Sequence, residues 1–226
     1  MSRLLVVGDS HARALALGAA ALGYETLSFA TSAAAWRDGI VQLTPQAALT
    51  SERFRARQKI EGFARELGCA TPLLSGLPVV ASIGFHSAQF LTEMRLARLG
   101  LTTVPSRSAK TTLSTAFLAD WLAEARSSAL EGLATIAAQA PLAVVAPPLF
   151  APNPLLQALN AALSQLIQAR GLPLYDPNTA LADSAGQLPA HFAHSDGKHG
   201  NATFGAAVLE DIISRNLIPK PPAPRA

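Results

Sequence analysis

Residues 4–11, LLVVGDSH, decide the fold of this 226-residue chain. The run from Leu4 to Val7 is apolar and rich in branched side chains, which is typical of a strand buried on both faces of a parallel sheet. The run ends at Gly8, and Ser10 then opens a stretch rich in Ala and Leu that favours a helix to about Leu22. A strand followed at once by a helix predicts the first unit of an α/β fold.

The rest of the chain repeats this alternation. We expect further strands at residues 24–30, 78–85, 142–146 and 172–175. We expect further helices at residues 50–67 (Ser51 as N-cap, Gly68 as stop), 112–138 (with a break near Gly132), 154–170 and 201–216. The pattern predicts a three-layer α/β/α sandwich whose central, mostly parallel sheet has about five strands. We expect one domain over residues 1–218 and a Pro-rich tail over residues 219–226.

The composition is that of a globular protein, with 50% hydrophobic and 15% charged residues. A net charge of +3 gives no reason to expect a nucleic-acid partner, because the cations are scattered. The exception is the group Arg53, Arg55, Arg57 and Lys59. It reads first as a solvated helix face, and alternatively as a patch for an acidic substrate or a lid that moves.

The sequence gives little sign of a membrane span or of cysteine chemistry. No apolar run reaches the roughly 18 to 20 residues that a spanning helix needs. Asp9, His11 and Arg13 interrupt the apolar N-terminal stretch, which argues against a signal peptide, so we expect a cytoplasmic protein. Cys69 is the single cysteine, which excludes an intramolecular disulfide and a cysteine metal cluster.

Two polar motifs follow predicted strands, at the edge where ligands bind in parallel sheets. Ser10 comes directly after the first strand, at a helix start whose amide groups favour negative charge. An alternative role for this motif is a helix cap, since Asp and Ser are preferred caps. Near the other end of the chain, Asp196 and His199 stand three residues apart in a Gly-punctuated loop. The order Ser, Asp, His favours a nucleophile, an orienting carboxylate and a general base.

Other chemistries find less support. His191 and His194 lie close to Asp196 and His199, so a metal site is an alternative, but we expect no metal and no cofactor. The chain lacks the G-x-S-x-G elbow of α/β-hydrolases and the glycine-rich motifs that cradle phosphates.

The G-D-S block at residues 8–10 and the D-x-x-H block at residues 196–199 resemble the SGNH (GDSL-like) hydrolase superfamily. The first block extended to Arg13, G-D-S-x-x-R, is also similar to the PC-esterase group. The resemblance covers nearly the whole chain in order and spacing, but only these two blocks are specific. It implies a flavodoxin-like three-layer fold, and a catalytic triad of Ser10, Asp196 and His199.

The resemblance also implies an oxyanion hole, in which this chain departs from the family. The Ser10 amide is the first donor. The family's second donor is the amide of a glycine that this chain lacks. A backbone amide from Ala33 to Ala35 can serve instead, because the donor is main chain, and we take Ala34. The family places G-x-N after the third strand, where this chain has Gly84, Phe85 and His86. A histidine ring N–H can donate to an oxyanion as an Asn amide does, so His86 is the expected third donor.

The resemblance implies hydrolysis of esters, with a small-molecule or carbohydrate-linked acyl ester as substrate. His11, Gly84 and His194 are the residues that we expect to contact it. Acyl transfer to a sugar hydroxyl shares the acyl-enzyme step and stays an alternative. A binding protein of this fold without turnover is the alternative from another class, because a fold never proves a function.

Overall fold

The computed structural model describes residues 3–83, 101–102, 111–112, 114–151 and 154–220. A parallel five-stranded sheet lies at its centre, in the order β2-β1-β5-β8-β9. Its strands are β1 (Arg3–Gly8), β2 (Glu25–Ala30), β5 (Val79–Ala81), β8 (Leu142–Val145) and β9 (Leu174–Tyr175). The described residues also contain two small two-stranded sheets: β3 (Gln42–Leu43) with β4 (Leu49–Thr50), and β6 (Leu101–Thr102) with β7 (Thr111–Thr112).

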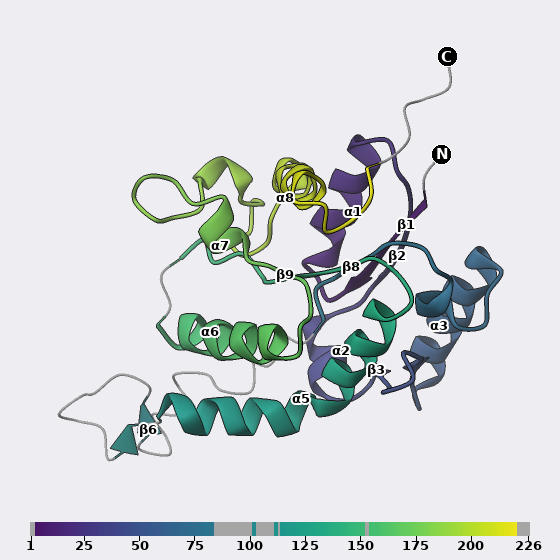
Figure 1. Cartoon of the computed structure of the whole chain (residues 1–226), viewed down its shortest axis with the longest axis horizontal. Coiled ribbons are helices and arrows are strands. Elements are labelled where there is room, and N and C mark those ends of the chain that lie inside the picture. The colour runs from purple at the N-terminus through teal and green to yellow at the C-terminus, as the bar shows by residue number, and fades with distance from the viewer. Residues whose placement is uncertain (1–2, 84–100, 103–110, 113, 152–153, 221–226) are drawn as a thin grey trace.

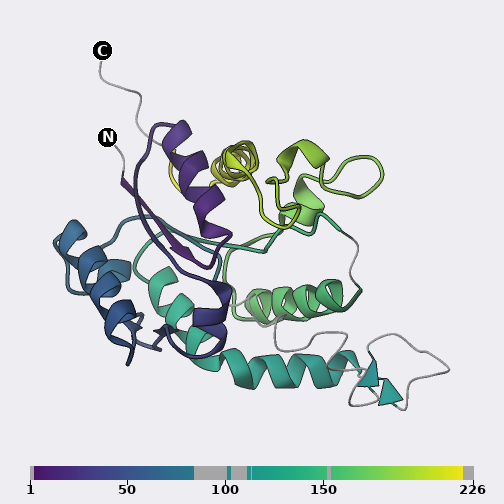
Figure 2. The same cartoon turned by 180° about the vertical axis from the view of Figure 1, so that it is seen from behind.

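Helices cover both faces of the central sheet (Figure 1). One side carries α1 (Ala12–Ala21), α7 (Pro177–Ala180), the short 3-10 helix η3 (Ala190–Phe192) and α8 (Ala202–Ser214). The other side carries α2 (Ala33–Arg37), α3 (Phe54–Leu67), η1 (Pro72–Leu74), α5 (Thr115–Ala137) and α6 (Pro154–Ala169). Figure 2 shows the same layers from behind. The predicted three-layer α/β/α architecture with about five strands is therefore confirmed.

Strand β1 supplies both halves of the core. Leu4 and Val6 belong to the cluster beneath α1 and α8, whereas Leu5 and Val7 belong to the cluster beneath the other helices. All four side chains are fully buried. This is the arrangement that the unbroken apolar run predicted, since side chains alternate between the two faces of a strand.

The helices α1 and α8 pack closely because each contributes a glycine to the contact. A Cβ on Gly18 would lie 2.1 Å from the Gly205 carbonyl carbon, and a Cβ on Gly205 would lie 1.8 Å from the Ala14 oxygen. Since α1 follows the Ser10 turn and α8 follows the His199 loop, this contact holds together two segments far apart in the sequence.

Several predicted boundaries were wrong. The helix expected from residue 50 begins at Phe54, because Thr50 belongs to β4, and its N-cap is Arg53 rather than Ser51. Its stop at Gly68 is confirmed, with a left-handed φ of 70°. Helix α5 continues through Gly132 without a break, and a Cβ on this glycine would lie 2.4 Å from the Thr44 oxygen. The glycine therefore serves close packing.

Other boundaries shifted by a few residues. Helix α1 begins at Ala12, two residues after Ser10. Strand β5 ends at Ala81, and residues 84–85 of the predicted third strand lie outside the described residues.

Candidate active site

The turn between β1 and α1 presents the Ser10 hydroxyl at the carboxyl edge of the sheet. The N-cap of α1 is His11, and Asp9 bonds the start of the helix: its Oδ1 accepts from the His11 amide at 3.0 Å and its carbonyl accepts from the Ala12 amide at 3.1 Å. Ser10 is therefore not needed as a cap. Its amide has no acceptor among the described residues, and its Oγ bonds to the His199 ring.

Two neighbouring segments hold this turn. Ser82, just after β5, bonds the buried Asp9 twice: its Oγ donates to Asp9 Oδ1 at 3.2 Å and accepts from the Asp9 amide at 3.3 Å. A Cβ on Gly8 would lie 2.0 Å from Ser82 Oγ, so only glycine fits there. On the other side, Trp36 Nε1 donates to the Gly8 carbonyl at 3.0 Å. The turn is thus fixed from β5 and from α2.

The second loop, residues 193–201, holds its own shape by backbone contacts. Ala193 and Gly200 form an isolated bridge, and the His194 amide donates to the His199 carbonyl at 2.7 Å. Asn201 closes the loop: its Nδ2 donates to the carbonyls of His191 and Ala193, at 2.7 and 3.2 Å, and its Oδ1 caps α8. These bonds present His199 toward Ser10.

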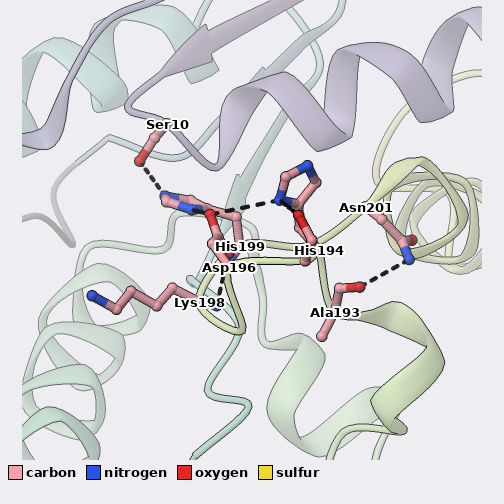
Figure 3. Close-up of polar contacts among 8 residues, drawn as sticks. Ser10, Ala193, His194, Asp196, Lys198, His199 and Asn201 are labelled. Carbon is pink, nitrogen blue, oxygen red and sulfur yellow. Dashed lines mark hydrogen bonds and ion pairs between the residues drawn. The ribbon is translucent and has the colours of Figure 1, made fainter.

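Ser10, His199 and Asp196 form a continuous chain of polar contacts (Figure 3). His199 Nε2 lies 2.8 Å from Ser10 Oγ, and His199 Nδ1 lies 2.6 Å from Asp196 Oδ2. A carboxylate can only accept, so Nδ1 carries the proton and Nε2 of the neutral ring is left to accept from the serine hydroxyl. The contact joins residues 189 positions apart.

Asp196 is fixed as a carboxylate. Its Oδ1 accepts from the amides of His199 and Lys198, at 3.0 and 2.9 Å. The His199 amide, the His199 ring and the Lys198 amide together hold the pKa of the Asp196 carboxyl well below its usual range. It therefore remains ionised, and able to orient His199, throughout the neutral range.

Comparisons with known proteins address the fold. No family model and no curated protein matches the sequence. A protein from Streptococcus pneumonia, described as a candidate platelet activating factor, aligns over 96% of this chain and 84% of its own length, with 13% identity and a TM-score of 0.52.

Two further structures align more loosely. A lipase/acylhydrolase from Enterococcus faecalis covers 98% of this chain and 100% of its own, with 13% identity and a TM-score of 0.45. A GDSL-like lipase from Bacteroides thetaiotaomicron covers 96% of this chain and 87% of its own, with 12% identity and a TM-score of 0.45.

The strand order and parallel pairing of the sheet define a three-layer α/β/α fold, and the Streptococcus structure aligns with it over nearly the whole chain. The chain therefore shares its three-layer α/β/α fold with this Streptococcus structure. At this level of identity the likeness concerns the fold alone, so the roles of the residues have to be argued from the site.

His11 lies against the His199 ring. The rings of His11 and His199 are 4.9 Å apart between centroids and tilted by 44°. His11 Nδ1 is buried and has no hydrogen-bond partner among the described residues. Burial lowers the pKa of the His11 imidazole, only partly offset by Asp9, so this ring is neutral beside His199.

The other predicted site residues are placed as follows. His194 is exposed, and its Nδ1 lies 3.6 Å from Asp196 Oδ2, the oxygen that His199 also contacts. Ala34 lies in the first turn of α2, and its amide has no acceptor among the described residues, whereas the Ala35 amide is taken by Ser32 Oγ at 3.1 Å. Gly84 and His86 lie outside the described residues.

The described residues were expected to hold no metal site and no membrane span. Within the part of the chain that the structure describes, no group of three His, Cys, Asp or Glu residues could hold a metal ion, including the loop with His191, His194 and His199. No helix among these residues is long and apolar enough to cross a membrane.

Sequence reasoning missed the residues that support the site. Ser82, Trp36 and Asn201 each fix one of the two loops through bonds that join distant or differently folded segments. Only Asn201 carried a sequence signal, because a side chain directly before a predicted helix is a natural cap. Nothing in the sequence linked Ser82 to Asp9, which are 73 positions apart.

Proposed function

We propose that the chain is a serine ester hydrolase in which Ser10 is the nucleophile, His199 the general base and Asp196 the residue that orients it. The observation that carries the proposal is the chain of contacts Ser10 Oγ–His199 Nε2–Asp196. A serine hydroxyl is a weak nucleophile until an adjacent base removes its proton. Here the base is within hydrogen-bond reach and in the required tautomer.

The reaction follows from these positions. As Ser10 Oγ bonds to the ester carbonyl carbon, its proton moves to His199 Nε2 and the carbonyl oxygen becomes an oxyanion. His199 then returns the proton to the leaving alkoxide, and an acyl ester on Ser10 remains. Water attacks this ester with His199 again as base, which releases the acid and restores Ser10. Asp196 stays a carboxylate in every step and stabilises the imidazolium.

Two unengaged amides are available for the oxyanion. The Ser10 amide and the Ala34 amide have no acceptor among the described residues, and the Ala35 amide is excluded because Ser32 already uses it. Of the three candidate amides, those of Ala33, Ala34 and Ala35, only the first two therefore remain. Preorganised amides of this kind stabilise charge that develops on the carbonyl oxygen.

His86 remains a proposed third donor, on the sequence motif alone. Replacing His86 by Ala should lower kcat by about 10²- to 10³-fold, the usual effect of removing one oxyanion donor. His86→Asn should recover part of this loss, because an amide can donate in the same way. Full activity of His86→Ala would remove His86 from the proposal and leave the triad intact.

Hydrolysis of p-nitrophenyl acetate tests the proposed function. Ser10→Ala should lower kcat/KM by about 10⁴-fold or more, as losing a triad member does in other serine hydrolases. The matched control is Ser195→Ala, since Ser195 is exposed in the loop that carries His199, and among the described residues its hydroxyl bonds only to the His194 ring, at 3.4 Å. Equal activity of the two variants would refute the assignment of Ser10.

A further inference from the structure

Helix α3 begins with a group of exposed cations. We call Arg53, Arg55, Arg57 and Lys59 the α3 cation cluster; all four are exposed. No ion pair to any of them occurs among the described residues, although Glu52 and Glu61 are close in sequence. The four cations fall within seven residues of the chain; Arg55 and Lys59, four residues apart, share one side of α3, and Arg57 lies on the other.

Helix stability does not account for this arrangement. The first turn of α3 contains no acidic residue, and its N-cap Arg53 makes no side-chain capping bond. Cations near a helix N-terminus oppose the helix dipole. The cluster therefore occupies the end of the helix where positive charge is least favourable for folding.

Contacts with β2 show which end of the sheet the cluster occupies. The Lys59 ammonium donates to the carbonyl of Ala30, the last residue of β2. One turn later, Phe63 packs against Phe29, the residue before Ala30, with the two rings tilted. Helix α3 therefore runs back along β2 from its carboxyl end. Arg55, one turn before Lys59, lies roughly 6 Å further out, beyond the end of the strand.

This is the end at which Ser10 lies. Ala30 pairs with Gly8, two residues before Ser10, and the Thr31 amide donates to the Gly8 carbonyl at 3.1 Å. Ala34, the proposed oxyanion donor, follows four residues after Ala30. Helix α3 lies on the β2 side of the sheet (Figure 1), and its Lys59 contacts the strand end from which the chain continues to Ala34.

We propose that the α3 cation cluster binds an anionic group of the substrate, so that Ser10 acts on a soluble ester bearing a phosphate or a carboxylate. This inference rests on the proposed hydrolase function. Unpaired cations at the mouth of a site attract anionic substrates and bind them by charge-assisted hydrogen bonds.

A membrane surface is a poorer fit for the same cations. An interfacial helix needs a free apolar face beside its basic one. The apolar face of α3 is already used, because Ala56, Ile60, Phe63 and Leu67 pack against the core. Of its apolar side chains only Phe54 is strongly exposed, at 63%.

Two esters of similar length separate charge from size: p-nitrophenyl butyrate, which is neutral, and mono-p-nitrophenyl succinate, which carries a carboxylate. The triple variant Arg53→Gln, Arg55→Gln, Arg57→Gln should lose about 10-fold in kcat/KM on the succinate ester, and less than about 2-fold on the butyrate. The wild-type preference for the succinate ester should fall at high salt.

Arg65→Gln is the matched control, because Arg65 is an exposed cation of the same helix about 15 Å beyond Arg55. It should change neither rate. The triple variant should keep or raise the melting temperature, since it removes unfavourable charges from a helix N-terminus. Equal losses on both esters, or no loss on either, would overturn the inference.

Binding is also measured without turnover. Calorimetry with phenyl phosphate on the Ser10→Ala protein should show binding that the triple variant abolishes. No binding to the intact cluster would overturn the inference whatever the esterase result, whereas binding without ester hydrolysis by the wild type would refute only the hydrolase proposal. Cluster-dependent binding to phosphatidylglycerol vesicles, without any preference for the succinate ester, would instead assign the cluster to a membrane.

Discussion

At the scale of single residues, the site depends on a buried polar pair that lies behind the proposed nucleophile. Asp9 and Ser82 are both almost fully buried and exchange two hydrogen bonds. Burial of polar groups is tolerated only when they are bonded. The pair therefore connects the conformation of the Ser10 turn to the end of β5.

Removing the Ser82 hydroxyl tests this connection. Ser82→Ala should lower the free energy of unfolding by about 1 to 3 kcal/mol, because the buried Asp9 loses partners that water cannot replace. It should also lower kcat/KM, since the turn carrying Ser10 is no longer fixed. Ser28→Ala, an exposed serine of β2, should change stability by no more than about 0.5 kcal/mol. Chemical denaturation of the two variants would show whether they differ; matching stabilities would contradict the role given to Ser82.

The pH dependence also belongs to single residues. Protonation of His199 Nε2 removes the base, so kcat/KM should fall as the pH is lowered from about 8 to about 5. The pKa of the Asp196 carboxyl is held well below its usual range, so it stays ionised, and burial lowers the pKa of the His11 imidazole, so this ring takes up its proton at a lower pH than an exposed histidine would. The acid limb should therefore have a slope of one.

The measurement is kcat/KM for p-nitrophenyl acetate across this range, at constant ionic strength. A flat profile would remove His199 as the base. A slope of two would mean that His11 takes up a proton in the same range, contrary to its burial.

At the scale of elements, the contact between α1 and α8 determines whether the two catalytic loops meet. Gly205→Ala places a methyl group where the Ala14 oxygen now lies, so the helices have to separate. Overpacking of this kind costs about 1 to 3 kcal/mol. Because α1 follows Ser10 and α8 follows His199, the separation should also reduce kcat/KM.

The control is another helical glycine replaced in the same way. A Cβ on Gly62 of α3 would meet no atom within 4 Å, so Gly62→Ala should stabilise the protein by about 0.5 to 1 kcal/mol. Thermal melts and rates of both variants make the comparison. If Gly205→Ala melts no lower than Gly62→Ala, the close approach of α1 and α8 is not what holds the loops.

At the scale of the whole molecule, much of the fold could be predicted because three strands of the sheet, β1, β5 and β8, are short apolar runs buried on both faces. The run from Leu4 to Val7 identified strand β1 and, through Gly8, the site beside it. The small sheet of β3 and β4 could not be predicted, since two residues per strand show no periodicity. Helix α2, with five residues, is also too short to reveal an apolar face.

The site was predictable in its reactive groups but not in its support. Ser10, Asp196 and His199 stand in recognisable blocks, and the fold brings them within hydrogen-bond reach. Sequence spacing cannot show that Ser82 reaches Asp9, or that Trp36 reaches the Gly8 carbonyl, because these contacts exist only after the sheet has assembled. The catalytic roles themselves stay predictions until they are measured.

The central claim is that folding turns Ser10 into a nucleophile by placing His199 beside it. Labelling with a fluorophosphonate, followed by peptide mass spectrometry, tests it most directly. We expect one adduct, on Ser10. His199→Ala should slow labelling strongly, whereas Ser195→Ala should leave it unchanged. Absence of the Ser10 adduct from the folded protein, or labelling that is equally fast without His199, would contradict the account.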